Sequence, residues 1–200
     1  MKQFFFFGDS ITLGVNDPKG NGWVGRFIHR AIDEYTLPVP PTTFYNLGAR
    51  RNSSRDILGR WAAEFSARRM QAARHYLVFC FGTVDTVLAD GRPNVGVGES
   101  EDNARLILSG AKEAGRVLLM SPPPVRDDSH CERIAALIRG YATLCHEAGI
   151  PFLDIFTPLR GARSFLNSLA DGIHSDPEGN TQIAALLLGS DVVRSWLQEG

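Results

Sequence analysis

The chain has 200 residues, of which 44% are hydrophobic and 22% are charged, and its formal net charge is -1. These values are ordinary for a soluble globular protein, and we interpret residues 1–200 as a single domain. The balanced charge argues against a nucleic-acid or membrane surface as the main partner. No stretch approaches the roughly 18 apolar residues of a membrane span, and the FFFF run near the N-terminus is too short for a secretion signal.

The three cysteines show no CxxC spacing, and each lies in an apolar or helical segment (Cys80, Cys131 and Cys145). This pattern favours buried free thiols in a reducing compartment over a metal site or a disulfide. We therefore expect a cytoplasmic protein without a metal. Because the chain is small and shows no long extra helix, we expect a monomer or weak homodimer.

Apolar runs of strand length alternate with longer segments of helical periodicity along the whole chain. The predicted strands are residues 2–7, 43–47, 75–81, 116–120 and 151–155. The predicted helices are residues 23–35, 55–74 with Ser53 as N-cap, 99–114, 131–148, and a last helix from its cap Asp176 to Trp196. Strand–helix repeats with continuously apolar strands predict a parallel sheet covered on both faces. We expect an α/β fold, a three-layer α/β/α sandwich with five parallel strands.

Small and polar residues follow the predicted strands, where ligands of such sheets bind. Ser10 follows the first strand, Gly48 the second, the sequence GTVD (82–85) the third and SPPPV (121–125) the fourth. The sequence DGIHSDPEGN (171–180) precedes the last helix. We expect these loops to meet at one edge of the sheet and to form a functional site there.

Ser10 and His174 are the best candidates for a nucleophile and its base. A serine hydroxyl is a weak nucleophile that needs a nearby base, and histidine suits proton transfer near neutral pH. A tight turn at Asp171 and Gly172 can direct the carboxylate of Asp171 to Nδ1 of His174, which leaves Nε2 for Ser10. Each signal is modest alone, since Asp9 and Ser10 could merely turn the chain and Asp171 could merely cap a turn. The other histidines (His29, His75, His130 and His146) are interpreted as surface or packing residues.

Four sequence blocks carry a resemblance to a known family: FGDSITLG, YNLGARRNSS, FGTVD and DGIHSDPEGN. The chain resembles the GDSL esterases and lipases, also called SGNH hydrolases, from residue 7 to residue 180. The resemblance implies a flavodoxin-like sheet and hydrolysis of a small-molecule carboxylic ester through an acyl-enzyme, without a cofactor. It also implies Ser10 as nucleophile, Asp171 and His174 as the rest of the triad, and an oxyanion hole made by the N–H groups of Ser10 and Gly48. Asp9 is assigned a structural role in the turn.

The chain departs from the family where Val84 replaces the asparagine of the Gly-x-Asn-Asp block. Valine has no hydrogen-bond donor, so one donor of the oxyanion hole is missing. Asn52 or Thr83 could replace it, or the enzyme could simply be slow. The alternatives to an esterase are a non-catalytic binding module on the same scaffold, and a thioesterase or carbohydrate deacetylase. We expect Thr83 and Val84 to contact the substrate.

Arg50 and Arg51 stand directly after the Gly48 block, and they have two interpretations. They could be solvated or paired with acids such as Asp56 or Asp85, or they could bind an anionic group of the substrate. Trp23 and Trp61 are interpreted as core or helix-packing residues rather than substrate platforms. Trp23, just beyond the Ser10 loop, is the one expected to edge the pocket if either does.

Overall fold

Five parallel strands form the central sheet in this computed structural model, which describes residues 1–35, 37 and 42–199. They are β1 (Lys2–Gly8), β2 (Thr43–Gly48), β3 (Arg74–Cys80), β6 (Arg116–Met120) and β7 (Phe152–Leu153). Their spatial order is β2-β1-β3-β6-β7, which is the flavodoxin-like order. The predicted five-stranded α/β/α sandwich is therefore confirmed.

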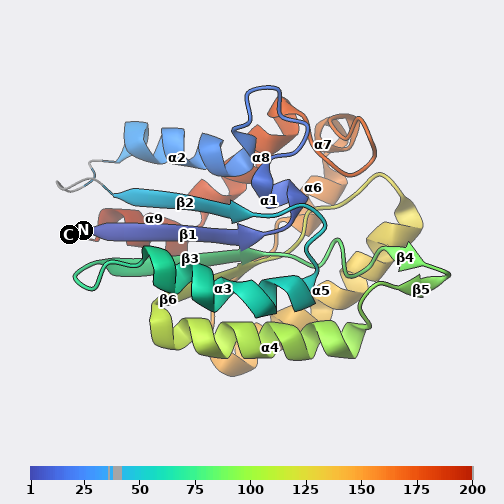
Figure 1. Ribbon diagram of the computed structural model, residues 1–200. Helices are drawn as coiled ribbons and strands as arrows, with labels where there is room; N and C mark the ends of the chain where they lie inside the picture. Colours follow the sequence, from blue (N-terminus) through green and yellow to red (C-terminus); the bar gives the residue numbers. More distant parts are fainter. Residues whose placement is uncertain (36, 38–41, 200) are drawn as a thin grey trace.

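Helices cover both faces of the sheet (Figure 1). On one face lie α2 (Gly22–Glu34), α8 (Pro177–Gly189) and α9 (Asp191–Gln198), and on the other lie α3 (Ser54–Arg68), α4 (Val97–Ala114) and α5 (Asp128–Ala148). The shorter elements are α1 (Ser10–Leu13), α6 (Phe156–Gly161), α7 (Arg163–Asn167) and a hairpin of β4 (Leu88–Ala89) and β5 (Arg92–Pro93). The hairpin projects from the end of the sheet to which β1 and β2 point (Figure 1).

Strand β1 is buried on both of its faces. Its phenylalanine side chains alternate between two hydrophobic clusters, with Phe4 and Phe6 in one and Phe5 and Phe7 in the other, and all four are 0% exposed. The ring of Phe4 stacks against that of Tyr76 with centroids 4.6 Å apart. The FFFF run thus supplies core to both layers of helices, as expected for a central strand.

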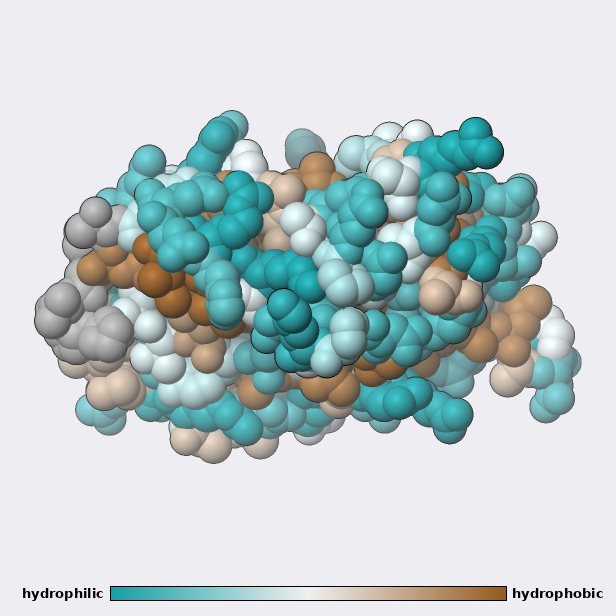
Figure 2. Space-filling view, turned by 90° about the horizontal axis from the view of Figure 1, so that it is seen from above, coloured by the Kyte–Doolittle hydropathy of each residue, from teal (hydrophilic) through white to brown (hydrophobic). Residues whose placement is uncertain are grey.

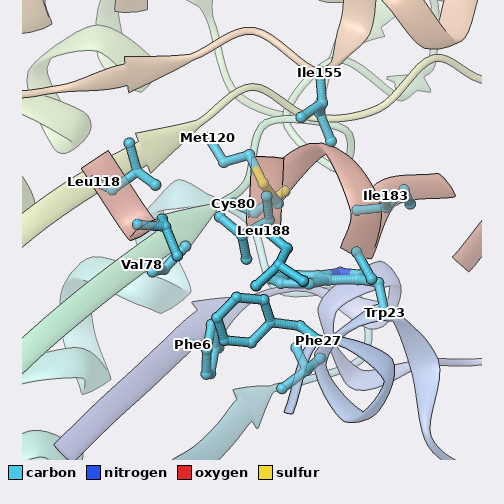
Figure 3. Packing of buried hydrophobic residues seen from close by; sticks show 14 of the residues in the cluster. Phe6, Trp23, Phe27, Val78, Cys80, Leu118, Met120, Ile155, Ile183 and Leu188 are labelled. Atoms are coloured by element: carbon cyan, nitrogen blue, oxygen red, sulfur yellow. The ribbon is translucent and has the colours of Figure 1, made fainter. Parts of the chain in front are cut away.

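Trp23 is a core residue, which confirms the favoured interpretation of this tryptophan. Its side chain is 0% exposed and meets the ring of Phe6 edge-on, with centroids 5.7 Å apart. Figure 3 shows it packed beside Phe6, Phe27 and Leu188. The helical position of Trp23 faces the sheet, and a large apolar ring gains more free energy there than at a solvated rim.

The predicted N-caps of two helices are confirmed, whereas the predicted C-terminal ends of these helices are wrong. The Asp176 side chain accepts hydrogen bonds from the N–H groups of the first turn of α8, and Ser53 with Asp56 forms a capping box on α3. The predicted last helix is instead two helices, because Ser190 is extended (φ -68°, ψ 129°) and serves as N-cap of α9. Helix α3 ends at Arg68, short of the predicted residue 74, and β7 covers only part of the predicted residues 151–155.

All three cysteines are free and buried, as predicted.

Figure 2 shows that hydrophobic atoms are exposed where the β4–β5 hairpin projects, and Val87 and Leu88 in this region are 38% and 46% exposed. Within the described part of the chain, no helix has both the length and the apolar character needed to cross a membrane.

The burial of β1 predicts a large loss of stability when one of its rings is truncated. Phe6→Ala should lower the free energy of unfolding by about 3–5 kcal/mol, because it removes apolar contacts and leaves a cavity between β1 and α2. Ile32→Ala, at a site 54% exposed on α2, should change it by less than about 0.5 kcal/mol. Urea unfolding measures both, and equal effects would contradict this description of the core.

Candidate active site

A pocket of about 480 Å³ lies at the carboxyl ends of the central strands. Its lining comes from the loops after β1, β2 and β3 and from the loop before α8, and it includes Ser10, Arg50, Arg51, Thr83, Val84 and His174. The sheet order reverses direction between β1 and β3, and ligands of open α/β sheets bind at this switch point. The fold therefore brings together most of the residues that the sequence singled out.

Ser10 is fixed by the turn that starts α1. Asp9 is the N-cap of this helix, and its Oδ1 accepts a hydrogen bond from the N–H of Ile11 at 2.8 Å. Burial raises the pKa of Asp9 to about 6, and the hydrogen bond from Ile11 and the nearby His174 oppose this rise. The hydrogen bond matches the structural role expected for Asp9.

Ser10, His174 and Asp171 form a continuous line of hydrogen bonds. The distance from Ser10 Oγ to His174 Nε2 is 2.8 Å, and that from His174 Nδ1 to Asp171 Oδ2 is 2.7 Å. The Asp171 carboxylate can only accept when ionised, so Nδ1 carries a proton and Nε2 is free to accept from Ser10. This arrangement lets the imidazole take the proton of the serine hydroxyl.

The loop from Asp171 to His174 makes the tight turn that the sequence predicted. Gly172 has φ 87°, and Asp171 Oδ1 accepts from the N–H groups of Ile173 and His174 at 2.9 and 2.8 Å. Partial burial opposes ionisation of Asp171, but hydrogen bonds from the backbone and the ring of His174 hold its pKa well below its usual range. Asn16 Nδ2 also donates to Asp171 Oδ2 at 2.9 Å. Asp171 is therefore a fixed anion beside the imidazole.

Gly48 does not fit the oxyanion-hole role that the resemblance implied. Its N–H donates to Asn46 Oδ1 at 3.0 Å, and Gly48 is not among the residues that line the pocket. A Cβ atom at Gly48 would lie 2.2 Å from the backbone nitrogen of Leu13. The glycine is needed here so that β2 can approach α1 closely.

Arg51, three residues after Gly48, lies at the pocket. It lines the pocket and has φ 62°, a left-handed conformation that costs a non-glycine residue about 1 kcal/mol or more. No described residue accepts a hydrogen bond from its backbone N–H. Strained backbone with a free donor is typical of functional sites.

Thr83 and Val84 line the pocket, whereas Asn52 does not. The amide of Asn52 is held by Arg60, whose Nε donates to Asn52 Oδ1 at 2.6 Å. Thr83 is 3% exposed, and its Oγ1 has no hydrogen-bond partner among the described residues. Val84 contributes an apolar surface, which the hairpin region extends with Val87 and Ala89.

Three residues that hold parts of the site in place were not predicted from the sequence. Asn16 holds Asp171, and Asn46 joins β2 to α1 by donating to the carbonyl of Thr12 at 3.0 Å. His130, interpreted as a packing residue, lies against the pocket loop through contacts of Nε2 with Thr86 Oγ1 and the carbonyl of Thr83. Burial lowers the pKa of His130. These long-range contacts leave no motif in the sequence.

Across the described residues, no group of three or more histidine, cysteine, aspartate or glutamate side chains is arranged to hold a metal ion.

The fold and the Ser–His–Asp line define an α/β sandwich with a serine site at the carboxyl edge of its sheet. A sequence profile of the GDSL-like lipase/acylhydrolase family matches residues 6–182. The chain therefore belongs to the GDSL-like lipase/acylhydrolase family, a family of hydrolases, as the four sequence blocks predicted. No curated protein sequence matches the chain.

Several solved structures share the fold. A lipase/acylhydrolase from Enterococcus faecalis aligns with a TM-score of 0.77 and 22% identity, covering 98% of this chain and 96% of its own. A lipolytic G-D-S-L family member from Veillonella parvula aligns with a TM-score of 0.77 and 19% identity over 96% and 99% of the two chains. An acetylxylan esterase from Geobacillus stearothermophilus aligns with a TM-score of 0.75 and 18% identity over 94% and 92%. At these identities the likeness concerns the fold.

The raised pKa of Asp9 predicts a stability that depends on pH. Aspartate ionises near pH 3.9 in an unfolded chain and near pH 6 in this fold, so the protonated group favours folding. Its contribution is fully present below about pH 4 and is lost as the pH rises through about 6, for a total of about 3 kcal/mol. Asp9→Asn keeps an acceptor for Ile11 but cannot ionise. The unfolding free energy of wild type, relative to that of Asp9→Asn, should therefore decrease as the pH rises from 4 to 6 in urea titrations. Parallel pH curves for the two proteins would contradict the raised pKa of Asp9.

Proposed function

We propose that the chain is a serine esterase that hydrolyses small carboxylic esters through an acyl-enzyme on Ser10. His174 takes the proton of Ser10 Oγ as the oxygen attacks the acyl carbon, and Asp171 stabilises the resulting imidazolium. The imidazolium then protonates the leaving alcohol. A water molecule, deprotonated by His174, attacks the acyl-enzyme and releases the acid. The observation that carries the proposal is the line from Ser10 Oγ to His174 Nε2 (2.8 Å) and on to Asp171 (2.7 Å).

In this proposal the oxyanion rests on the backbone N–H groups of Ser10 and Arg51 instead of Gly48. Ser10 is the first residue of α1, and an N–H at that position has no acceptor within the helix. The N–H of Arg51 has no described acceptor, whereas that of Gly48 is taken by Asn46. Two donors without the family's asparagine stabilise the transition state less than three, so we expect a slow enzyme.

The apolar side of the pocket suits the hydrocarbon part of a substrate, because Ile11, Val84, Val87 and Ala89 all contribute to the lining. In this proposal the enzyme acts as a monomer or weak homodimer in the cytoplasm and needs no cofactor.

Fluorophosphonate labelling tests whether Ser10 is an activated nucleophile. Wild type should be labelled and should hydrolyse 4-nitrophenyl acetate and butyrate, and Ser10→Ala should lose both properties. Ser195→Ala, in α9 at the other end of the sheet, should behave as wild type. Absence of labelling and of Ser10-dependent turnover would replace the esterase with a non-catalytic binding module. Labelling with poor aryl-ester turnover would instead favour a thioesterase or a carbohydrate deacetylase.

Restoring an amide at position 84 tests the two-donor oxyanion hole. Val84→Asn should raise kcat for 4-nitrophenyl butyrate by about tenfold or more, because a missing donor costs about 100- to 1000-fold in comparable sites. Val84→Leu, which adds bulk without a donor, is the matched control and should give no gain.

Thr83→Val completes this test, because the buried hydroxyl of Thr83 is the remaining candidate for a third donor. With two backbone donors only, Thr83→Val should leave kcat within about threefold of wild type, since no donor of the hole is lost. A loss of about 100-fold in Thr83→Val, together with no gain in Val84→Asn, would contradict the two-donor hole and assign the third donor to Thr83.

A further inference from the structure

The cationic side of the pocket is formed by Arg50 and Arg51, both of which are exposed and line the cavity that contains Ser10. Neither guanidinium has an ion pair or a hydrogen bond with any residue that the structure describes. By contrast, the next arginine along the chain, Arg55, is paired with Glu99 and also donates to the carbonyl of Asn94. The guanidinium donors of the two pocket arginines are therefore free of partners among the described residues.

The acids that could have neutralised these arginines already have other partners. Asp85 is fully buried and accepts from the N–H of Ser54 and from Ser100, and Asp56 accepts from Ser53. The alternative in which Asp56 or Asp85 pairs with Arg50 or Arg51 is therefore wrong.

The acids closest to the nucleophile are likewise engaged. Asp171 accepts from His174, from Ile173 and from Asn16. Asp9 also lines the pocket, but it is buried and its Oδ1 accepts from Ile11. The described lining of the cavity thus carries two positive charges with no counter-ion bound to them. A guanidinium has five donors in a planar fork that matches a carboxylate or phosphate.

We propose that Arg50 and Arg51 bind a negatively charged group of the ester, such as a carboxylate, so that the preferred substrates are anionic esters. This inference rests on the proposed esterase function and names its substrate class. Ser10 follows β1, the arginines follow β2, and the apolar residues Val84 and Val87 follow β3, with β1 between the other two strands. An ester at Ser10 is therefore within reach of both a cationic and an apolar part of the lining.

Two pairs of substrates, each consisting of a carboxylate and its methyl ester, test the proposal. The acyl-side pair is 4-nitrophenyl hydrogen adipate and 4-nitrophenyl methyl adipate, and the alcohol-side pair is 4-acetoxybenzoate and its methyl ester. In at least one pair, kcat/KM of wild type should be about tenfold or more higher for the anion, because a hydrogen bond to a charged group contributes that much. The pair that shows the preference identifies the part of the ester that carries the charge. The preference should weaken in 1 M NaCl, where the screening length falls to about 3 Å.

Variants then assign the preference to the two side chains. Arg50→Gln and Arg51→Gln should each lower the anionic-to-neutral ratio of kcat/KM by about tenfold, mainly through KM for the anion, and Arg50→Lys should retain part of it. Arg51→Gly should also lower the ratio, because it removes the guanidinium and keeps the backbone N–H. Arg92→Gln removes a positive charge from the hairpin strand β5, outside the pocket lining, and should keep the wild-type ratio. No preference in either pair, or equal ratios in all variants, would overturn the proposal.

A binding measurement separates failure of this inference from failure of the esterase proposal. Calorimetric titration of Ser10→Ala with the two adipate esters requires no turnover. Tighter binding of the anionic ester, abolished by adding Arg50→Gln, would support the arginine site even if wild type hydrolyses neither ester. Equal binding of the two esters to Ser10→Ala would overturn the arginine site whatever the catalytic result.

Discussion

The burial of β1 on both faces is the constraint on which the whole site depends. Its alternating phenylalanines hold the strand between two helical layers, so Ser10, two residues after the strand, has little freedom of position. The His174 loop is tied to the same cluster, because α8 packs Ile183 and Leu187 against the face that contains Phe4 and Phe6. A hydrogen bond of 2.8 Å between Ser10 and His174 therefore joins two elements that share one core. Preorganisation of this kind lets a site act without rearrangement.

Two aspartates near the nucleophile have opposite environments, and this difference separates their roles. Asp9 is buried with one backbone donor on Oδ1, so its pKa rises to about 6 and its main effect is to hold the turn. Asp171 receives several hydrogen bonds and stays ionised, so it can stabilise a positive charge on His174. The side-chain type is the same in both places, and the depth of burial together with the donors that reach each carboxyl decides what it can do.

The sequence predicted the fold because each of its signals is local. Continuous apolar strands, the caps Ser53 and Asp176 and the turn at Gly172 act within a few residues, and all appear in the structure. Prediction from the sequence failed where a contact between distant segments decides the role of a residue. Gly48, which was expected to contribute to the oxyanion hole, packs closely against Leu13 of α1, and Arg51 lines the pocket instead. The roles of Asn16 and His130 also depend on such contacts, because their partners lie 155 and 44 to 47 residues away in the chain.

Arg51 brings both a backbone N–H and a guanidinium to the pocket. Its left-handed conformation presents a free N–H at the pocket, and a glycine would adopt the same conformation without a steric penalty. Arginine at this position therefore contributes nothing to the backbone geometry and carries a strain of about 1 kcal/mol or more. What it adds is a guanidinium beside Arg50 on a cavity whose neighbouring acids are already bound. In the proposed esterase, this positive charge lies in the pocket that would hold the ester, so substrate recognition is the effect that we propose for the side chain.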